Sequence, residues 1–271
     1  MDVSSSSLFW IFGFWTPNPK SKIQNRMSWQ LLVDPALDGR TNMESDAALL
    51  NEAENAAEPT TVVRFYQWMP ATLSLGRHQK PEQAADLEFC AERGIPIVQR
   101  PTGGRAVLHD DELTYAVASN ELDRFSGASI YETYKSISQA LRLGLERLGV
   151  PAILAPETRK PDRTQNGADH PCFASPSRYE LTADSRKIVG SAQRRCRRSF
   201  LQHGSILIAC DRDKLARATR VADPQALEVA VVGIAELLGR RPSASEMIEA
   251  FVAGFREHFS VEFTQRSACI L

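Results

Sequence analysis

The sequence predicts an α+β fold, a single domain in which a mixed, mostly antiparallel sheet is packed with helices. Two observations favour this class. The predicted strands and helices are mixed without the regular strand–helix alternation that builds a parallel sheet. The chain of 271 residues contains 43% hydrophobic residues, ample for one large core, and has no internal repeat, long linker or low-complexity block that would divide it.

The first 26 residues stand apart from the predicted domain. Their apolar stretch, residues 8–15, is too short to span a bilayer, and no Lys or Arg precedes it as in a secretory signal. Met27 then opens a stretch that looks like a natural protein start. We therefore expect residues 1–26 to be a disordered tail or a mis-assigned start, and residues 27–271 to form the domain.

The first part of the domain is predicted to contain two helices and three strands. Residues 42–56 indicate a helix, because acidic residues lead and alanines recur. Residues 81–93 predict a second helix that ends at Gly94, a residue type common after helix C-termini. β-Branched and aromatic residues predict strands at 61–68, 71–75 and 95–100.

The middle of the chain contains the clearest helix. Residues 102–105 are predicted to form a loop, followed by strands at 106–109 and 113–119. Between 130 and 148 apolar residues recur at spacings of three and four, which predicts an amphipathic helix ended by Gly149.

The last part begins with residues 156–171, whose polar, Pro-rich composition predicts a loop. Strands are predicted at 178–182, 187–193 and 200–208. We expect the tail to be helical, with residues 224–238 as one segment and another helix starting at the capping box Ser243-Ala244-Ser245-Glu246.

The composition excludes several classes of function. A net charge of -1 and a pI near 6.5 argue against a nucleic-acid partner. The five cysteines, at 90, 172, 196, 210 and 269, have no CxxC spacing, so neither a zinc site nor a disulfide framework is indicated. We expect a cytoplasmic monomer with no cofactor, no metal and no membrane contact.

Cys172 and Lys187 are the most telling pair of residues. A thiolate can carry an acyl group as a thioester, and the ammonium of Lys187, fifteen residues later, can lower the thiol pKa. The small residues Gly190-Ser191-Ala192 would let a ligand pass close to the strand. The alternatives are a buried structural cysteine and a solvated strand lysine.

Other candidate residues also have structural alternatives. Gly103-Gly104 can present N–H groups to an anion or can form a tight turn. His109 is either a base or part of a hairpin closure, and His203 is expected to line or support the site. Cys196 lies within a run of arginines that can lower a thiol pKa, although a hairpin tip is the expected location.

Three segments resemble the superfamily of lipoate–protein ligases, octanoyltransferases and biotin ligases. They are Arg100-x-Thr102-Gly103-Gly104-x-x-Val107-x-His109-Asp110, the lysine segment 187–193, and the early segment 68–79. Together with Cys172-Phe-x-x-Pro-Ser-x-Tyr-Glu180, they look most similar to the LipM-type octanoyltransferases. Gln99 departs from the family pattern, which has a second arginine there.

The resemblance implies a biotin/lipoate ligase-like catalytic domain in which Cys172 carries the acyl chain and Lys187 assists it. It also implies a set of substrate-binding residues: Arg100, Thr102, Gly103, Gly104, His109, Gly190, Ser191 and Ala192. The implied reaction takes an octanoyl group from octanoyl-acyl carrier protein to a lysine of a lipoyl domain, such as that of the glycine cleavage H protein. Arg100, Arg105 and the cluster 194–198 are candidates to meet these acidic partners.

Two other enzymes on the same fold remain open. An ATP-dependent lipoate–protein ligase would keep Lys187 and the glycine loop but would not require Cys172. An octanoyl amidotransferase would use the same cysteine with one lipoyl domain as the donor and another as the acceptor. A member that only binds acyl or lipoyl proteins is the non-enzymatic alternative.

Overall fold

An eight-stranded sheet is the centre of the protein. The computed structural model describes residues 28–125, 129–155, 180–221 and 225–267. The strand order in the sheet is β11-β1-β2-β6-β10-β9-β8-β7. Its members are β1 (Ser28–Leu37), β2 (Thr61–Trp68), β6 (Glu112–Ser119), β7 (Ile153–Leu154), β8 (Leu181–Ala183), β9 (Arg186–Arg195), β10 (Phe200–Leu207) and β11 (Glu262–Arg266).

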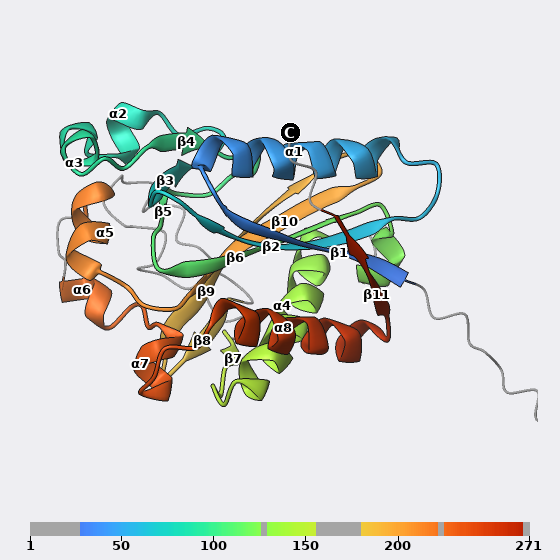
Figure 1. Cartoon of the computed structure of the whole chain (residues 1–271). Helices are drawn as coiled ribbons and strands as arrows, with labels where there is room; N and C mark the ends of the chain where they lie inside the picture. The colour runs from blue at the N-terminus through green and yellow to red at the C-terminus, as the bar shows by residue number, and fades with distance from the viewer. Residues whose placement is uncertain (1–27, 126–128, 156–179, 222–224, 268–271) are drawn as a thin grey trace, which may run out of the picture.

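Helices cover both faces of this sheet (Figure 1). α4 (Ile130–Arg147) and α8 (Ala244–Phe259) pack on one face, and α1 (Gly39–Asn55) lies on the other. Because both faces are covered, β6 and β10 are buried along their whole length. Alternate side chains on one strand therefore enter different cores: Phe65 faces α8, whereas Tyr66 packs in the cluster beneath α1.

A second, smaller layer lies at one end of the large sheet, near the start of α1 (Figure 1). It contains a three-stranded sheet in the order β4-β3-β5 and a separate apolar cluster. Its elements are β3 (Thr72–Leu75), β4 (Ile97–Gln99), β5 (Val107–His109), α2 (Pro81–Ala84), α3 (Leu87–Glu92), α5 (Arg212–Ala218) and α6 (Gln225–Glu228). The functional site described below lies between this layer and α1.

The fold class and most central elements are confirmed. The helix predicted at 130–148 is α4, the strand at 61–68 is β2, and Ser243 caps α8 by accepting a hydrogen bond from the Glu246 N–H. The sheet is mixed, because β1 runs parallel to both β2 and β11 while the other neighbouring pairs are antiparallel.

Two predicted helices are interrupted. The helix expected at 81–93 is split into α2 and α3, because Ala85 and Asp86 adopt extended backbone and the Asp86 carboxylate caps α3 at Phe89 N–H. The prediction of a single helix over residues 224–238 is also wrong. Between α6 and α7 (Ile234–Leu238), Val231 forms a parallel β-bridge with Lys187.

Two predictions about chain organisation concern residues outside the described ranges: the loop at 156–171 and the tail at 1–26. Within the described part of the chain, no helix is both long and apolar enough to cross a bilayer.

Glycines allow α4 and α8 to approach each other closely. A Cβ atom on Gly254 would lie 2.3 Å from the Ala140 carbonyl oxygen, and one on Gly144 would lie 2.3 Å from Phe251 Cδ1. Such distances are shorter than real Cβ contacts, so a larger side chain at either position would force the two helices apart.

Gly254→Ala is therefore expected to lower the free energy of unfolding by about 1–3 kcal/mol through overpacking. The gain in helix propensity, about 1 kcal/mol, acts in the opposite direction. Urea denaturation measures the effect, with exposed Glu249→Ala in the same helix as the control within about 0.5 kcal/mol of wild type. A Gly254→Ala protein as stable as wild type would show that the helix contact is looser than described.

Candidate active site

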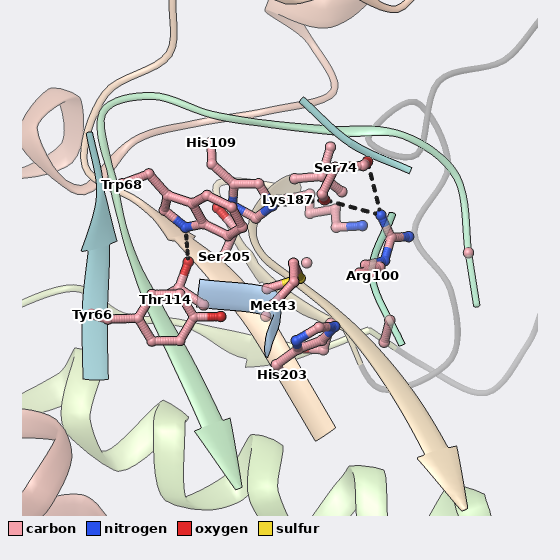
Figure 2. Close-up of a pocket in the computed structure, with 16 residues that line it drawn as sticks. Met43, Tyr66, Trp68, Ser74, Arg100, His109, Thr114, Lys187, His203 and Ser205 are labelled. Atoms are coloured by element: carbon pink, nitrogen blue, oxygen red, sulfur yellow. Dashed lines mark hydrogen bonds between the residues drawn. The ribbon is translucent and has the colours of Figure 1, made fainter. Parts of the chain in front are cut away.

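A pocket lies between α1, the large sheet and the smaller sheet (Figure 2). Its lining comes from segments far apart in the sequence, including Met43 on α1, Ser74 on β3 and His203 on β10. Seven of the residues predicted to form the site line it: Arg100, Gly104, His109, Lys187, Gly190, Ser191 and Ala192. The two remaining residues of the glycine motif, Thr102 and Gly103, belong to the loop that borders it, and Cys172 lies outside the described residues.

Lys187 is buried at the start of β9 and only 3% exposed. Its Nζ donates a hydrogen bond to Glu180 Oε1 at 2.7 Å, and the Glu180 side chain is 4% exposed. Backbone hydrogen bonds to Ala230 and Val232 fix the strand position of Lys187. The lysine is therefore held by a buried, compensated ion pair, and the alternative of a solvated strand lysine is wrong. In the sequence, Glu180 was named only as the last residue of the Cys172 motif, without a role.

Arg100 shapes the glycine loop from inside. Its Nη2 donates to the carbonyl oxygens of Gly103 at 2.8 Å and Arg105 at 2.6 Å, and its Nη1 donates to the Ser74 carbonyl at 3.0 Å. Because Arg100 is buried, it cannot meet a partner protein at the surface, and that part of our expectation is wrong.

The loop also depends on close backbone approach. Gly104 has a φ of +95°, and a Cβ on Gly76 would lie 1.9 Å from the Gly104 carbonyl oxygen. The N–H groups of Gly103 and Gly104 donate no hydrogen bond to any described residue. Two such groups beside a pocket are suited to receive a carbonyl oxygen or an anion.

His109 is held in the wall of the pocket. Its ring stacks on Trp68 with centroids 4.0 Å apart, and its Nε2 lies 2.8 Å from Ser74 Oγ. Burial lowers the pKa of His109, so the imidazole is neutral at neutral pH. Its Nδ1 lies 3.5 Å from Glu112 Oε1, and the adjacent Asp110 accepts a hydrogen bond from Lys214.

His203 lines the pocket, as expected, and joins two buried partners. Its Nδ1 lies 2.7 Å from Asp46 Oδ2, and its Nε2 lies 2.7 Å from Thr102 Oγ1. Asp46, on the buried face of α1, was missed by sequence reasoning. An acidic residue at a buried position of an amphipathic helix was the available signal.

One wall of the pocket is apolar and aromatic, with Met43, Tyr66 and Trp68 side by side in Figure 2. The polar atoms of the two rings are already bonded: Trp68 Nε1 donates to Thr114 Oγ1, and the Tyr66 hydroxyl donates to Asp46. Burial, followed by the charge of Asp46, raises the pKa of Tyr66 well above its usual value, so the phenol stays neutral. The wall therefore suits a hydrocarbon chain, whereas Lys187 and the glycine loop suit a polar group.

The three described cysteines lie outside this pocket. Burial raises the pKa of Cys90, and it raises the pKa of Cys210 to about 11, so both are protonated at neutral pH. Cys196 occupies the tight turn between β9 and β10, where its N–H donates to the Ser199 carbonyl, which confirms the expected hairpin tip.

Comparison with known proteins agrees with this fold. An octanoyltransferase LipM from Moorella thermoacetica is 40% identical over 243 residues, covering 87% of this chain and 88% of that protein. A second octanoyltransferase LipM, from Staphylococcus aureus, is 37% identical over 246 residues and covers 87% of this chain and 88% of its own.

Solved structures share the fold at lower identity. A lipoate-protein ligase A bound with ATP superposes with a TM-score of 0.74 at 22% identity, covering 90% of each chain. A bi-partite lipoate protein ligase from Thermoplasma acidophilum superposes with a TM-score of 0.69 at 20% identity, covering 90% of this chain and 88% of its own. The family model described as the lipoyl protein ligase A/B catalytic domain matches residues 38–256. The chain therefore belongs to the lipoyl protein ligase A/B catalytic domain family.

Proposed function

We propose that this protein is an acyltransferase that moves an octanoyl group from octanoyl-acyl carrier protein to a lysine of a lipoyl domain. The observation that carries this proposal is the pocket itself. It joins an apolar aromatic wall, which fits a medium-length acyl chain, to a buried lysine and a glycine loop whose N–H groups have no partner among the described residues. The octanoyltransferases from Moorella and Staphylococcus support the choice of the octanoyl group.

The first half-reaction forms an acyl-enzyme. The thiolate of Cys172 attacks the thioester carbonyl of the donor, and the carbon–sulfur bond to the carrier's phosphopantetheine breaks. The carrier leaves as a thiolate that takes a proton from solvent. The N–H groups of Gly103 and Gly104 stabilise the negative oxygen that develops on the carbonyl.

The second half-reaction forms the amide. The neutral ε-amine of the acceptor lysine attacks the Cys172 thioester, the carbon–sulfur bond breaks, and Cys172 leaves as a thiolate. The proton lost by the attacking nitrogen passes to solvent, so the enzyme returns to its starting state with Cys172 as a thiolate. A thioester is converted to a more stable amide, so this half-reaction needs no ATP.

Lys187 is proposed to favour the thiolate at both stages by placing a positive charge in the pocket. Glu180 holds the lysine in position and at the same time compensates part of that charge. The balance between these two buried groups sets how strongly the thiol pKa is lowered.

Acidic partners are proposed to dock beside the β9–β10 turn. β9 carries both the pocket residues 190–192 and the arginines that lead into the turn, where Arg197 and Arg198 are exposed. Arg198 already bonds to α1 through Glu54 and Ala56, which leaves Arg197 as the better candidate. The enzyme is proposed to act as a monomer. It would meet the donor and the acceptor in the cytoplasm, where thiols stay reduced.

An ATP-dependent lipoate–protein ligase is the second candidate, because a ligase bound with ATP shares the fold. Intact mass spectrometry separates the two. Incubation with octanoyl-acyl carrier protein without ATP is expected to add one octanoyl group to the protein, which a lipoyl domain then removes. Modification of the lipoyl domain only with free acid and ATP, and no adduct, would instead identify a ligase. Adduct formation only from an octanoylated lipoyl domain would identify an amidotransferase.

A further inference from the structure

A chain of buried hydrogen bonds runs from α1 to the glycine loop. Asp46 on α1 contacts His203 on β10, and His203 contacts Thr102 in the loop, each at 2.7 Å. All three side chains are nearly inaccessible, with 0% exposure at Asp46 and Thr102. The half-reactions proposed above do not involve these hydrogen bonds, although His203 lines the same pocket.

Asp46 is ionised in this environment. Burial alone would raise its pKa, but the hydrogen bond from His203 and the charge of Arg64 outweigh burial and bring the pKa below its usual value. The carboxylate accepts from Arg64 Nη1 at Oδ1, and from the Tyr66 hydroxyl and His203 at Oδ2. Every group that faces this carboxylate in these bonds is therefore a donor.

An ionised carboxylate can only accept hydrogen bonds, so His203 must carry its proton on Nδ1. In a ring that carries only this one proton, Nε2 accepts and the Thr102 hydroxyl donates to it. We propose that Asp46 and His203 are positioning residues that hold the glycine loop ready for the thioester oxygen by fixing the direction of the Thr102 hydrogen bond.

The loop is anchored on two sides in this arrangement. Arg100 holds the Gly103 and Arg105 carbonyls, while Thr102 is held by His203 through its side chain and by Arg77 N–H through its carbonyl at 2.8 Å. The backbone between these anchors carries the N–H groups of Gly103 and Gly104, which no residue in the described part of the chain accepts from. The inference rests on the proposed function, because these groups are assigned there to the developing oxyanion.

Asp46→Asn tests the tautomer directly. Arg64 can only donate, so the carbonyl oxygen of the amide is expected to face Arg64 and the amide NH2 to face His203. Nδ1 must then accept, the proton moves to Nε2, and the hydrogen bond to Thr102 is reversed. Ring ¹⁵N chemical shifts at neutral pH are expected to show Nδ1–H in wild type and Nε2–H in the variant.

The same variant is expected to lower kcat for acyl-enzyme formation about tenfold, the usual effect of one misdirected hydrogen bond, with little change in KM for the donor. A change confined to kcat is expected because the negative oxygen develops only in the transition state and the tetrahedral intermediate, and not in the bound donor. Loss of stability alone would instead lower the amount of active enzyme without moving the tautomer.

Thr102 provides a test that does not depend on Asp46. Thr102→Val removes the hydroxyl at nearly constant volume and is expected to lower kcat about tenfold, whereas Thr102→Ser is expected to restore it. Thr61→Val is the matched control, because Thr61 is equally buried and bonds to Ser119 at 2.7 Å, away from the pocket. It is expected to reduce stability but leave kcat unchanged.

The outcomes separate the inference from the proposed function. A wild-type His203 with a proton on Nε2, alone or together with one on Nδ1, overturns the inference even if the protein transfers octanoyl groups normally. Equal kcat for Thr102→Val and Thr102→Ser overturns it as well. If wild type transfers no acyl group from any donor, the proposed function fails, while the ring tautomer is still measured without substrate. If Asp46→Asn does not fold, the ¹⁵N shifts of the wild-type His203 ring and the comparison of Thr102→Val with Thr102→Ser still test the inference.

Discussion

Replacement of Cys172 by alanine is expected to abolish the octanoyl adduct and to reduce ATP-independent transfer by about 10⁴-fold or more. Without the sulfur, the donor thioester has no enzyme nucleophile to attack it, and direct attack by the acceptor lysine would require both partner proteins at one pocket. The adduct is measured by intact mass after mixing with octanoyl-acyl carrier protein. Its thioester nature is tested by cleavage with neutral hydroxylamine.

The other cysteines provide matched controls for this result. Cys90 and Cys210 are unsuited to the role, because burial raises both thiol pKa values and that of Cys210 reaches about 11. Cys196 is the remaining rival among the described residues, since it lies among arginines at the β9–β10 turn. Cys196→Ala is expected to keep the full adduct, as its turn is separate from the pocket lining.

Persistence of the adduct in Cys172→Ala, or its loss in Cys196→Ala, would remove Cys172 from the mechanism. Transfer that continues in Cys172→Ala only when ATP and free octanoate are supplied would point to ligase chemistry. Each result leaves the fold and the pocket untouched, because neither depends on the sulfur.

The parts of the fold that the sequence could predict are those whose burial is uniform. β2, β6 and β10 are covered on both faces and buried along almost their whole length, and β2 is rich in β-branched and aromatic residues, whereas α4 has a single apolar stripe. β1 was missed because Asp34 and Pro35 interrupt its pattern where the strand shifts register. β11 was missed because its partner, β1, lies more than 230 residues away in the sequence.

The candidate site, too, could be predicted from the sequence only in part. Motif residues such as Lys187 and Gly104 could be named from the sequence, and they do line one pocket. The groups that hold them could not, because the contacts are made across the fold: Asp46 meets His203 across 157 positions. Gly76 appeared only as part of a motif, and its purpose is visible only where its backbone lies against the Gly104 carbonyl.

Lys187→Met is expected to reduce acyl-enzyme formation at pH 7 by about 10²–10³-fold, since methionine keeps the length of the side chain but removes the charge. Loss of the cation raises the pKa of the Cys172 thiol, so less thiolate is present at any pH below that pKa. The rate deficit should therefore be largest at low pH and shrink as the pH rises through the new thiol pKa. Stopped-flow acylation across pH 5–10 measures this shift of the acid limb.

Glu180→Gln is the matched counterpart, because it leaves the lysine in place and removes only the compensating anion. With the ammonium less compensated, the thiol pKa is expected to fall and the acid limb to move to lower pH, opposite to Lys187→Met. Opposite displacements by the two members of one buried ion pair cannot be explained by general destabilisation, which would slow both variants at every pH. A pH–rate profile that is unmoved in Lys187→Met would show that the lysine does not act on the thiol, and its buried position would then have to be explained by the ion pair with Glu180 alone.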